Sequence, residues 1–166
     1  ADLLLQSQME IPPLSAQALY TGIVSDSNRF LYPRTNHHTM LLAGKIMQSL
    51  PDLQLIYRHL YHYPYNLFKL KIALAQYFNL ASNGLGSVVL TDADLQKLHT
   101  SAQTAKQQIS FFATISEVKI MLMVVEDRSE GKIKFSLRSK DMPVLAVCQY
   151  YGGGGHKFAA AGFLTN

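Results

Sequence analysis

The chain has 166 residues but only one cysteine, Cys148, and no tryptophan. A single thiol excludes an internal disulfide framework, which is the pattern of proteins in reducing compartments, so we expect a cytoplasmic location. Cys148 closes the apolar stretch 144–148. A small buried side chain is a better interpretation of this cysteine than a reactive nucleophile.

Long apolar runs are also missing, since none approaches the roughly 18 residues that a membrane span needs. Residues 1–6 lack the basic start of a signal peptide. We therefore expect no membrane-spanning segment within this chain. The sequence opens with Ala1 rather than Met, and we expect it to be a fragment excised from a longer protein.

Charged residues are few, at 16%, whereas hydrophobic residues make up 48%. This composition excludes a disordered chain and allows one ordinary domain or two small ones. The net charge of +4 is mild. It permits an anionic ligand without requiring one.

Hydrophobic periodicity predicts an α/β fold, in which helices come first and a mixed sheet follows. The pattern favours helices over residues 14–22, 36–50, 67–78 and 156–161, with another from Thr91 to about Phe112 and one that starts near Pro143. Strands are expected at Val118–Val125 and Lys132–Ser139. Tyr61–Asn66 is interpreted as a linker between two parts of the chain.

The run Gly152-Gly153-Gly154-Gly155-His156 is the strongest chemical signal. Glycines let several backbone N–H groups converge on one point, and an ensuing helix N-terminus would add positive charge. With His156 as a further donor, the segment suits a phosphate. The alternative is a flexible hinge or a helix C-cap. The residue types alone favour the phosphate site and this alternative about equally.

Ser136 and Arg138 form a second signal, because period-two alternation places both on the polar face of the strand Lys132–Ser139. The planar fork of an arginine matches phosphate oxygens. An ordinary solvated strand face, with Lys134 beside them, is the alternative.

Asp26 is the third signal, since it follows the apolar residues Ile23 and Val24. A carboxylate in such a position can hold a divalent cation. One carboxylate does not make a metal site, and a capping or turn role for Asp26 is the alternative.

Three segments together resemble the DHH phosphoesterase family. Ala18–Phe30 (ALYTGIVSDSNRF) is similar to the family's last metal-binding motif, L-Y-x-G-I-x-x-D-T-G-x-F. Ser136-Leu137-Arg138-Ser139 resembles the S-x-R-S strand of the DHH-associated domain, and Gly152–Gly162 resembles its G-G-G-H-x-x-A-A-G loop. The order and separation also match, and the resemblance extends to the branch of bacterial oligoribonucleases and 3′-phosphoadenosine 5′-phosphate phosphatases.

The resemblance implies a division of the chain and a role for each part. Residues 1–62 would be the end of a catalytic domain, with Asp26 as a catalytic ligand to a two-metal Mn²⁺ site. Residues 63–166 would be the substrate-binding domain. There, Ser136, Arg138, Ser139, Gly153, Gly154, Gly155 and His156 would hold a short single-stranded oligonucleotide or a nucleotide. A homodimer is a further expectation of this resemblance.

The family's upstream Asp-rich and Asp-His-His motifs have no counterpart in this chain, so we expect it to be inactive alone. Ser27 and Asn28 stand where the family has Thr and Gly. Two other readings stay open at this point. One is a piece of a cyclic di-AMP phosphodiesterase, which shares these domains, and the other is a stand-alone nucleotide-binding or RNA-binding module.

Overall fold

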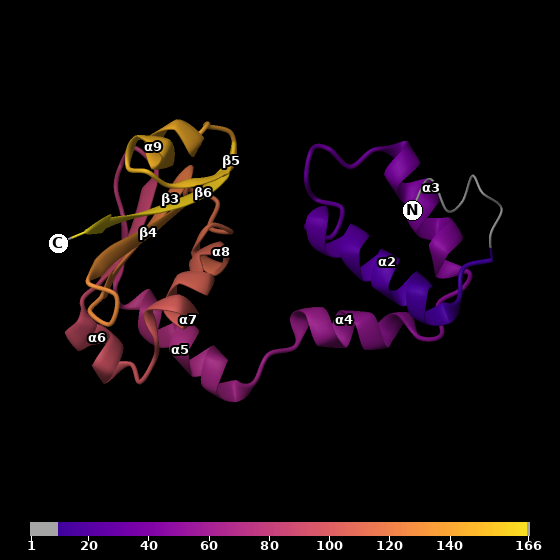
Figure 1. Ribbon diagram of the computed structural model, residues 1–166, viewed down its shortest axis with the longest axis horizontal. Helices are drawn as coiled ribbons and strands as arrows, with labels where there is room; N and C mark the ends of the chain where they lie inside the picture. Colours follow the sequence, from indigo (N-terminus) through magenta and orange to yellow (C-terminus); the bar gives the residue numbers. More distant parts are fainter. Residues whose placement is uncertain (1–9, 166) are drawn as a thin grey trace. The chain divides into compact units, whose positions relative to one another are not determined.

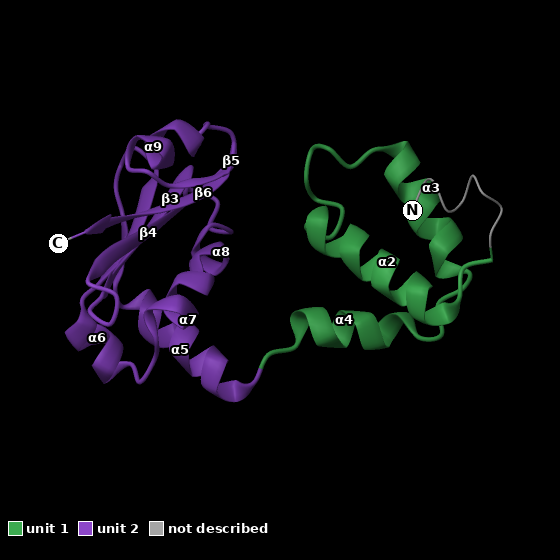
Figure 2. Ribbon diagram, viewed as in Figure 1, with its two compact units in different colours: residues 1–63 green, residues 64–166 purple. Residues whose placement is uncertain are grey.

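The computed structural model describes residues 10–165, which divide into two compact units with the boundary between Tyr63 and Pro64 (Figure 2). The sequence placed this boundary between residues 62 and 63. The first unit is helical and the second is built on a sheet, and each has a hydrophobic core of its own. Within residues 10–165, no helix combines the length and the apolar character that crossing a membrane requires.

Within residues 10–63, the first unit has three helices (Figure 1). Their buried side chains form a small core. The helices are α2 (Pro13–Asp26), α3 (His37–Met47) and α4 (Leu53–Tyr61). Asn36 and Asp52 cap α3 and α4, since each side chain accepts a hydrogen bond from a backbone N–H three residues on. The buried side chains of the three helices include Val24, Ile46 and Ile56.

Asp26 is the last residue of α2, whereas the sequence predicted that this helix would end at Gly22. The helix continues because Val24 is buried in the core and extends its apolar face. It ends where Asn28, Arg29 and Phe30 take positive φ angles of 47°, 63° and 65°. A hydrogen bond of 2.9 Å from the Phe30 N–H to the Ser27 hydroxyl supports this turn. The Asp26 carboxylate is left exposed at the helix end.

The second unit is a six-stranded mixed sheet with the order β1-β2-β3-β4-β6-β5, which confirms the predicted α/β class. Only β2 and β3 are parallel. The strands are β1 (Phe78–Leu80), β2 (Leu85–Leu90), β3 (Ile120–Asp127), β4 (Lys132–Ser139), β5 (Gly154–His156) and β6 (Ala159–Thr165). Helix α5 (Tyr65–Ala75) precedes them, so the helix expected through Phe78 is shorter than predicted.

The single helix predicted from Thr91 to Phe112 is wrong, because three short helices occupy this segment. They are α6 (Asp92–Lys97), α7 (Ala102–Gln107) and α8 (Ile109–Phe112). His99 takes a positive φ of 48°, which ends α6, and Ser101 caps α7 through the Thr104 N–H. Local turn chemistry therefore overrides the continuous apolar periodicity.

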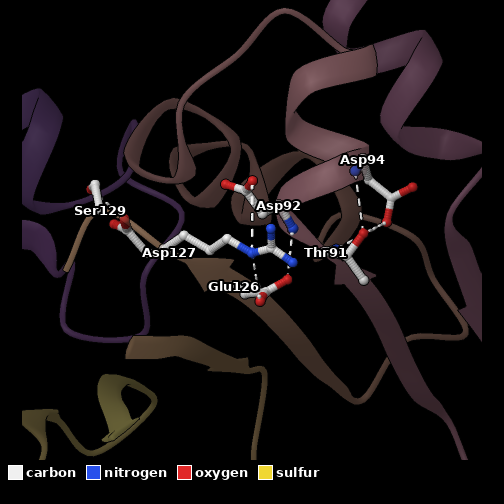
Figure 3. Close-up of polar contacts among 7 residues, drawn as sticks. Thr91, Asp92, Asp94, Glu126, Asp127 and Ser129 are labelled. Atoms are coloured by element: carbon white, nitrogen blue, oxygen red, sulfur yellow. Dashed lines mark hydrogen bonds and ion pairs between the residues drawn. The ribbon is translucent and has the colours of Figure 1, made fainter. Parts of the chain in front are cut away.

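The start of α6 is fixed by its own cap and by the end of β3 (Figure 3). Thr91 and Asp94 form a reciprocal capping box, with the Thr91 N–H donating to the Asp94 carboxylate at 2.9 Å. The Asp92 N–H donates to a carboxylate oxygen of Glu126, also at 2.9 Å. These bonds join the helical layer to the sheet.

The two faces of the sheet are covered by different helices (Figure 1). On one face, α5 to α8 pack against the inward side chains of β2 and β3, among them Met121 and Met123. On the other face, α9 (Leu145–Tyr150) packs Cys148 against Phe135 and Leu137 of β4. Cys148 is fully buried, which confirms its interpretation as a core residue.

The helix predicted over residues 156–161 is wrong, because this segment belongs to β5 and β6. His156 pairs with Ala159 across the two-residue turn Lys157-Phe158. The alanines that favoured a helix are instead held in β6 by backbone pairing with β4. Tertiary pairing thus outweighs the helical preference of alanine, which is a weak determinant by itself.

The turn between β3 and β4 predicts how stability depends on pH. Hydrogen bonds from Lys134 and Ser129 lower the pKa of Asp127 from 3.8 to about 2. The folded state therefore binds fewer protons than the unfolded state in this range, so the stabilisation exists above pH 4 and is lost as the pH falls towards 2. In Asp127→Asn, the free energy of unfolding should change less between pH 4 and pH 2, as measured by urea denaturation. Parallel curves for the two proteins would contradict this.

Candidate phosphate-binding surface

Strands β4, β6 and β5 bring small residues together on one face of the sheet. Ser136 of β4 pairs with Ala161 of β6, which pairs with Gly154 of β5. Residues paired across strands share a face, and Ala159 lies two residues from Ala161 on that face. We call these four residues the floor. Because β4 pairs with β3 so that Ser136 is opposite Met123, the floor continues the face that α5 to α8 cover further along the sheet.

Arg138 and His156 lie at one end of the floor. Arg138 pairs with Ala159, which pairs with His156, so all three are in register on the same face. Two strand spacings separate Arg138 from His156, or roughly 10 Å between Cα atoms, and only the methyl group of Ala159 lies between them. Among residues 10–165, Arg138 has no acidic partner; its guanidinium donates to the neighbouring Leu137 carbonyl at 3.0 Å.

The glycines of this segment differ in what they do. A Cβ on Gly153 would lie 2.2 Å from the Ala161 carbonyl oxygen, and a Cβ on Gly155 would lie 2.5 Å from that of Ala159. Gly155 also has a φ of +140°, which side chains rarely tolerate. These two glycines allow β5 to approach β6 closely. A Cβ on Gly154 would meet nothing within 4 Å, because this residue faces the open floor.

Gly152 ends α9 as part of its C-cap. Its φ is +70°, and the N–H groups of Gly152 and Gly153 donate to the carbonyls of Gln149 and Cys148. This is the bonding pattern of a Schellman C-cap. The helix-cap alternative from the sequence therefore holds for Gly152, whereas the expected helix N-terminus beside the glycines does not exist.

A pocket of 310 Å³ lies at the other end of the floor. It is lined by Lys106, Lys134, Ala161 and Phe163 and by the glycines at 152–154 and 162. Lys134 is ion-paired with Asp127 at 2.9 Å and with Glu130 at 2.6 Å. Lys106, on α7, has no ion-pair partner of this kind among the residues that the structure describes.

The charge of Lys106 is disfavoured in this setting. Partial burial lowers its pKa, and the neighbouring positive charges of Lys134 and Arg138 lower it further. Lys106 therefore lies close enough to be repelled by the cations at both ends of the floor, Lys134 and Arg138. The sequence does not indicate this position of Lys106, because a lysine in a short helix usually lies on a solvated surface. Lys134, by contrast, shares the alternation of Ser136 and Arg138, so the same pattern could have placed it among the predicted site residues.

Two of the predicted site residues are not brought to the floor. Ser139 lies on the opposite face of β4 from Arg138. Its hydroxyl accepts a hydrogen bond from the Met142 N–H at 2.9 Å. Gly155 pairs with Ala160, which packs in the core beneath α9. Ser136, Arg138, Gly154 and His156 do share the floor's face, and Gly153 lies at its edge.

Asp26 belongs to the first unit, and the described residues place no metal-binding cluster around it. Among residues 10–165, no group of three or more His, Cys, Asp or Glu side chains is arranged to hold a metal ion. A divalent cation in proteins is held by several oxygen or nitrogen ligands. The described residues therefore do not fit a Mn²⁺ site by themselves.

Comparison with known proteins identifies the second unit. Residues 85–166 match the family model of the DHHA1 domain. The chain carries a DHHA1 domain. This match covers both the S-x-R-S strand and the glycine–histidine segment, so the resemblance to the DHH-associated domain is confirmed. All the residues of the floor lie inside the matched DHHA1 region.

The chain also matches curated relatives over most of its length. It is 31% identical over 156 residues to the bifunctional oligoribonuclease and PAP phosphatase NrnA of Mycoplasma genitalium, and 32% identical over 146 residues to the protein of that name from Bacillus subtilis. These alignments cover 94% and 88% of the chain. They cover 48% and 46% of the relatives, so the chain spans about half the length of the curated relatives it matches.

A solved structure shares the fold. The exopolyphosphatase-related protein from Bacteroides fragilis superposes with a TM-score of 0.83, at 23% sequence identity. The match covers 94% of this chain and 46% of that protein. The order of elements found here is therefore that of a known α/β protein.

The different surroundings of Gly153 and Gly154 predict opposite effects of the same substitution. Gly153→Ala should lower the free energy of unfolding by about 2 kcal/mol, because the added methyl collides with β6. Gly154→Ala should leave it unchanged or raise it by about 0.5 kcal/mol, because the added methyl meets only open space. Urea denaturation of the two variants measures this difference. Equal destabilisation by the two substitutions would contradict the close approach of Gly153, rather than Gly154, to β6.

Proposed function

We propose that this chain is the substrate-binding part of a phosphoesterase that hydrolyses short oligonucleotides, 3′-phosphoadenosine 5′-phosphate or both. The DHHA1 domain and the names of the relatives support the reaction class. In this proposal the floor of β4, β6 and β5 holds a phosphate of the substrate, with Arg138 and His156 as donors.

The unpaired charge of Arg138 is the observation that carries the proposal. An arginine that is partly buried without an acidic partner loses hydration and gains no ion pair in return. A phosphate on the floor would supply the missing charge, and the guanidinium can donate to it with two parallel hydrogen bonds. The small residues Ala159, Ala161 and Gly154 leave room for such a group beside the backbone.

Asp26 would supply one ligand to a metal site completed by residues other than those described here. Its position at the exposed end of α2 is compatible with this role, because neither a salt bridge nor a hydrogen bond to its carboxylate occupies it within residues 10–165. Since the described residues do not fit Mn²⁺ alone, we derive no step of the reaction through a metal.

A cytoplasmic location and a homodimeric assembly belong to the same proposal. The only cysteine is buried and has no partner for a disulfide, which suits a reducing compartment. Several large apolar side chains of α3, among them Met40 and Leu41, are about half exposed. Such side chains suit an association surface.

Arg138→Ala should weaken binding of adenosine 5′-monophosphate to the chain by roughly tenfold or more, since charge-assisted hydrogen bonds to phosphate are lost. Isothermal titration calorimetry at low salt measures this, and binding to the wild type should also weaken as salt rises. Arg128→Ala is the matched control, because Arg128 is 70% exposed and pairs with Glu126 on the β3–β4 turn. Equal losses in both variants would mean that Arg138 acts only through net charge.

A further inference from the structure

The pocket lined by Lys106 and Lys134 has a charge that nothing in its surroundings balances fully. Asp127 and Glu130 hold the Lys134 ammonium at 2.9 and 2.6 Å, so that cation is already compensated and fixed in place. Lys106 approaches the same space from α7 and is partly buried. It has no carboxylate at ion-pair distance within residues 10–165. An occupant of this pocket should therefore carry negative charge.

The backbone of residues 152–154 forms another wall of the pocket. Gly154 offers no side chain, and a Cβ there would meet nothing within 4 Å. Because no Cβ stands in the way, an anionic group can approach the peptide units of these glycines directly. The Lys106 cation is available to it in the same pocket. Phe163 lines the same pocket and is 43% exposed, with the Lys132 ammonium 4.6 Å from the centre of its ring. An aromatic ring flanked by cations is the combination that binds single-stranded nucleic acid.

The distance along β4 separates this pocket from the Arg138 end of the floor. Lys134 and Arg138 are four residues apart on one strand, or roughly 13 Å between Cα atoms. Asp127 and Glu130 hold the Lys134 ammonium at its own end, so the two ends are separate points of positive charge. Ala161 and Gly154 lie between them and are partly or fully exposed, whereas Ser136 in the same row is buried.

We propose that the pocket binds a second phosphate of the same substrate, with Lys106 as its principal cation. This inference rests on the proposed function of the Arg138 end and adds a specificity to it. The floor then prefers ligands with two phosphates, such as a 5′-phosphorylated dinucleotide or a nucleoside bisphosphate, over mononucleotides. Lys106 is a specificity-determining residue in this arrangement, while Lys134 shapes the pocket and is held by Asp127 and Glu130.

The lowered pKa of Lys106 agrees with this assignment, since its main causes are burial and then the cations Lys134 and Arg138. If Lys106 served packing alone, removal of its charge would stabilise the folded protein. Replacing Lys106 with methionine preserves most of the apolar stem and removes the repulsion. Lys106→Met should therefore melt at the same temperature as the wild type or higher, while it binds two-phosphate ligands less well.

The test is calorimetric titration of the 166-residue chain in EDTA with three ligands. They are adenosine 5′-monophosphate, 5′-phosphorylated diadenylate and adenosine 3′,5′-bisphosphate. For Lys106→Met, the affinity for the preferred two-phosphate ligand should fall about tenfold, and that for the monophosphate less than twofold. Lys106→Arg should retain the preference. Lys97→Met is the matched control, because Lys97 is an exposed lysine of the neighbouring helix α6.

Each outcome decides the proposal. A tenfold loss with diadenylate points to an oligonucleotide, and the same loss with the bisphosphate alone points to a nucleoside bisphosphate; either supports a second phosphate site. Equal losses for all three ligands would overturn it, because Lys106 would then share the phosphate of Arg138. No loss for any ligand would overturn it as well. If Arg138→Ala is also without effect, or the wild type binds none of the ligands, the proposed function fails together with this inference.

Discussion

The antiparallel pairing of β4 with β6 determines where the candidate site lies. Its register places Ser136 opposite Ala161 and Arg138 opposite Ala159, and β5 extends both rows to Gly154 and His156. A slip of β6 by one residue would turn Ala159 and Ala161 towards the core around Cys148 and bring Ala160 to the floor's face. The pairing therefore has to be fixed firmly, and the close approach of Gly153 and Gly155 to β6 contributes to this.

In our proposal, the charges of this face serve a bound anion rather than the stability of the free protein. Lys134 is the compensated cation, bound by Asp127 and Glu130. Arg138 lies on this face and Lys106 approaches it from α7, and neither has an acidic partner at ion-pair distance in the described part of the chain. Burial and the charges of Lys134 and Arg138 disfavour the charge of Lys106. Such unbalanced charges reduce stability, and functional sites are where proteins retain them. An anion bound on the floor would relieve this repulsion.

The sequence predicted those features that depend on local patterns. The strict alternation of Lys132–Ser139 identified β4 with its bounds. The two motifs that contain Arg138 and His156 led to the DHH-associated domain, and the DHHA1 match covers both. The helix expected at residues 156–161 failed because alanine and glycine carry little local preference for a strand, and only pairing with β4 makes them one. Lys106 was missed because its place beside Lys134 results from long-range packing of α7 on the sheet.

The central claim is that the floor holds phosphate groups, and a ¹H–¹⁵N NMR titration of the chain with 5′-phosphorylated diadenylate tests it most directly. The account predicts that the largest amide shifts fall on Gly153, Gly154, Ala159 and Ala161 and continue towards Lys134. Amides of α9, on the other side of the sheet, should shift little. Shifts concentrated in α9 or in the first unit, with the floor unaffected, would contradict the account.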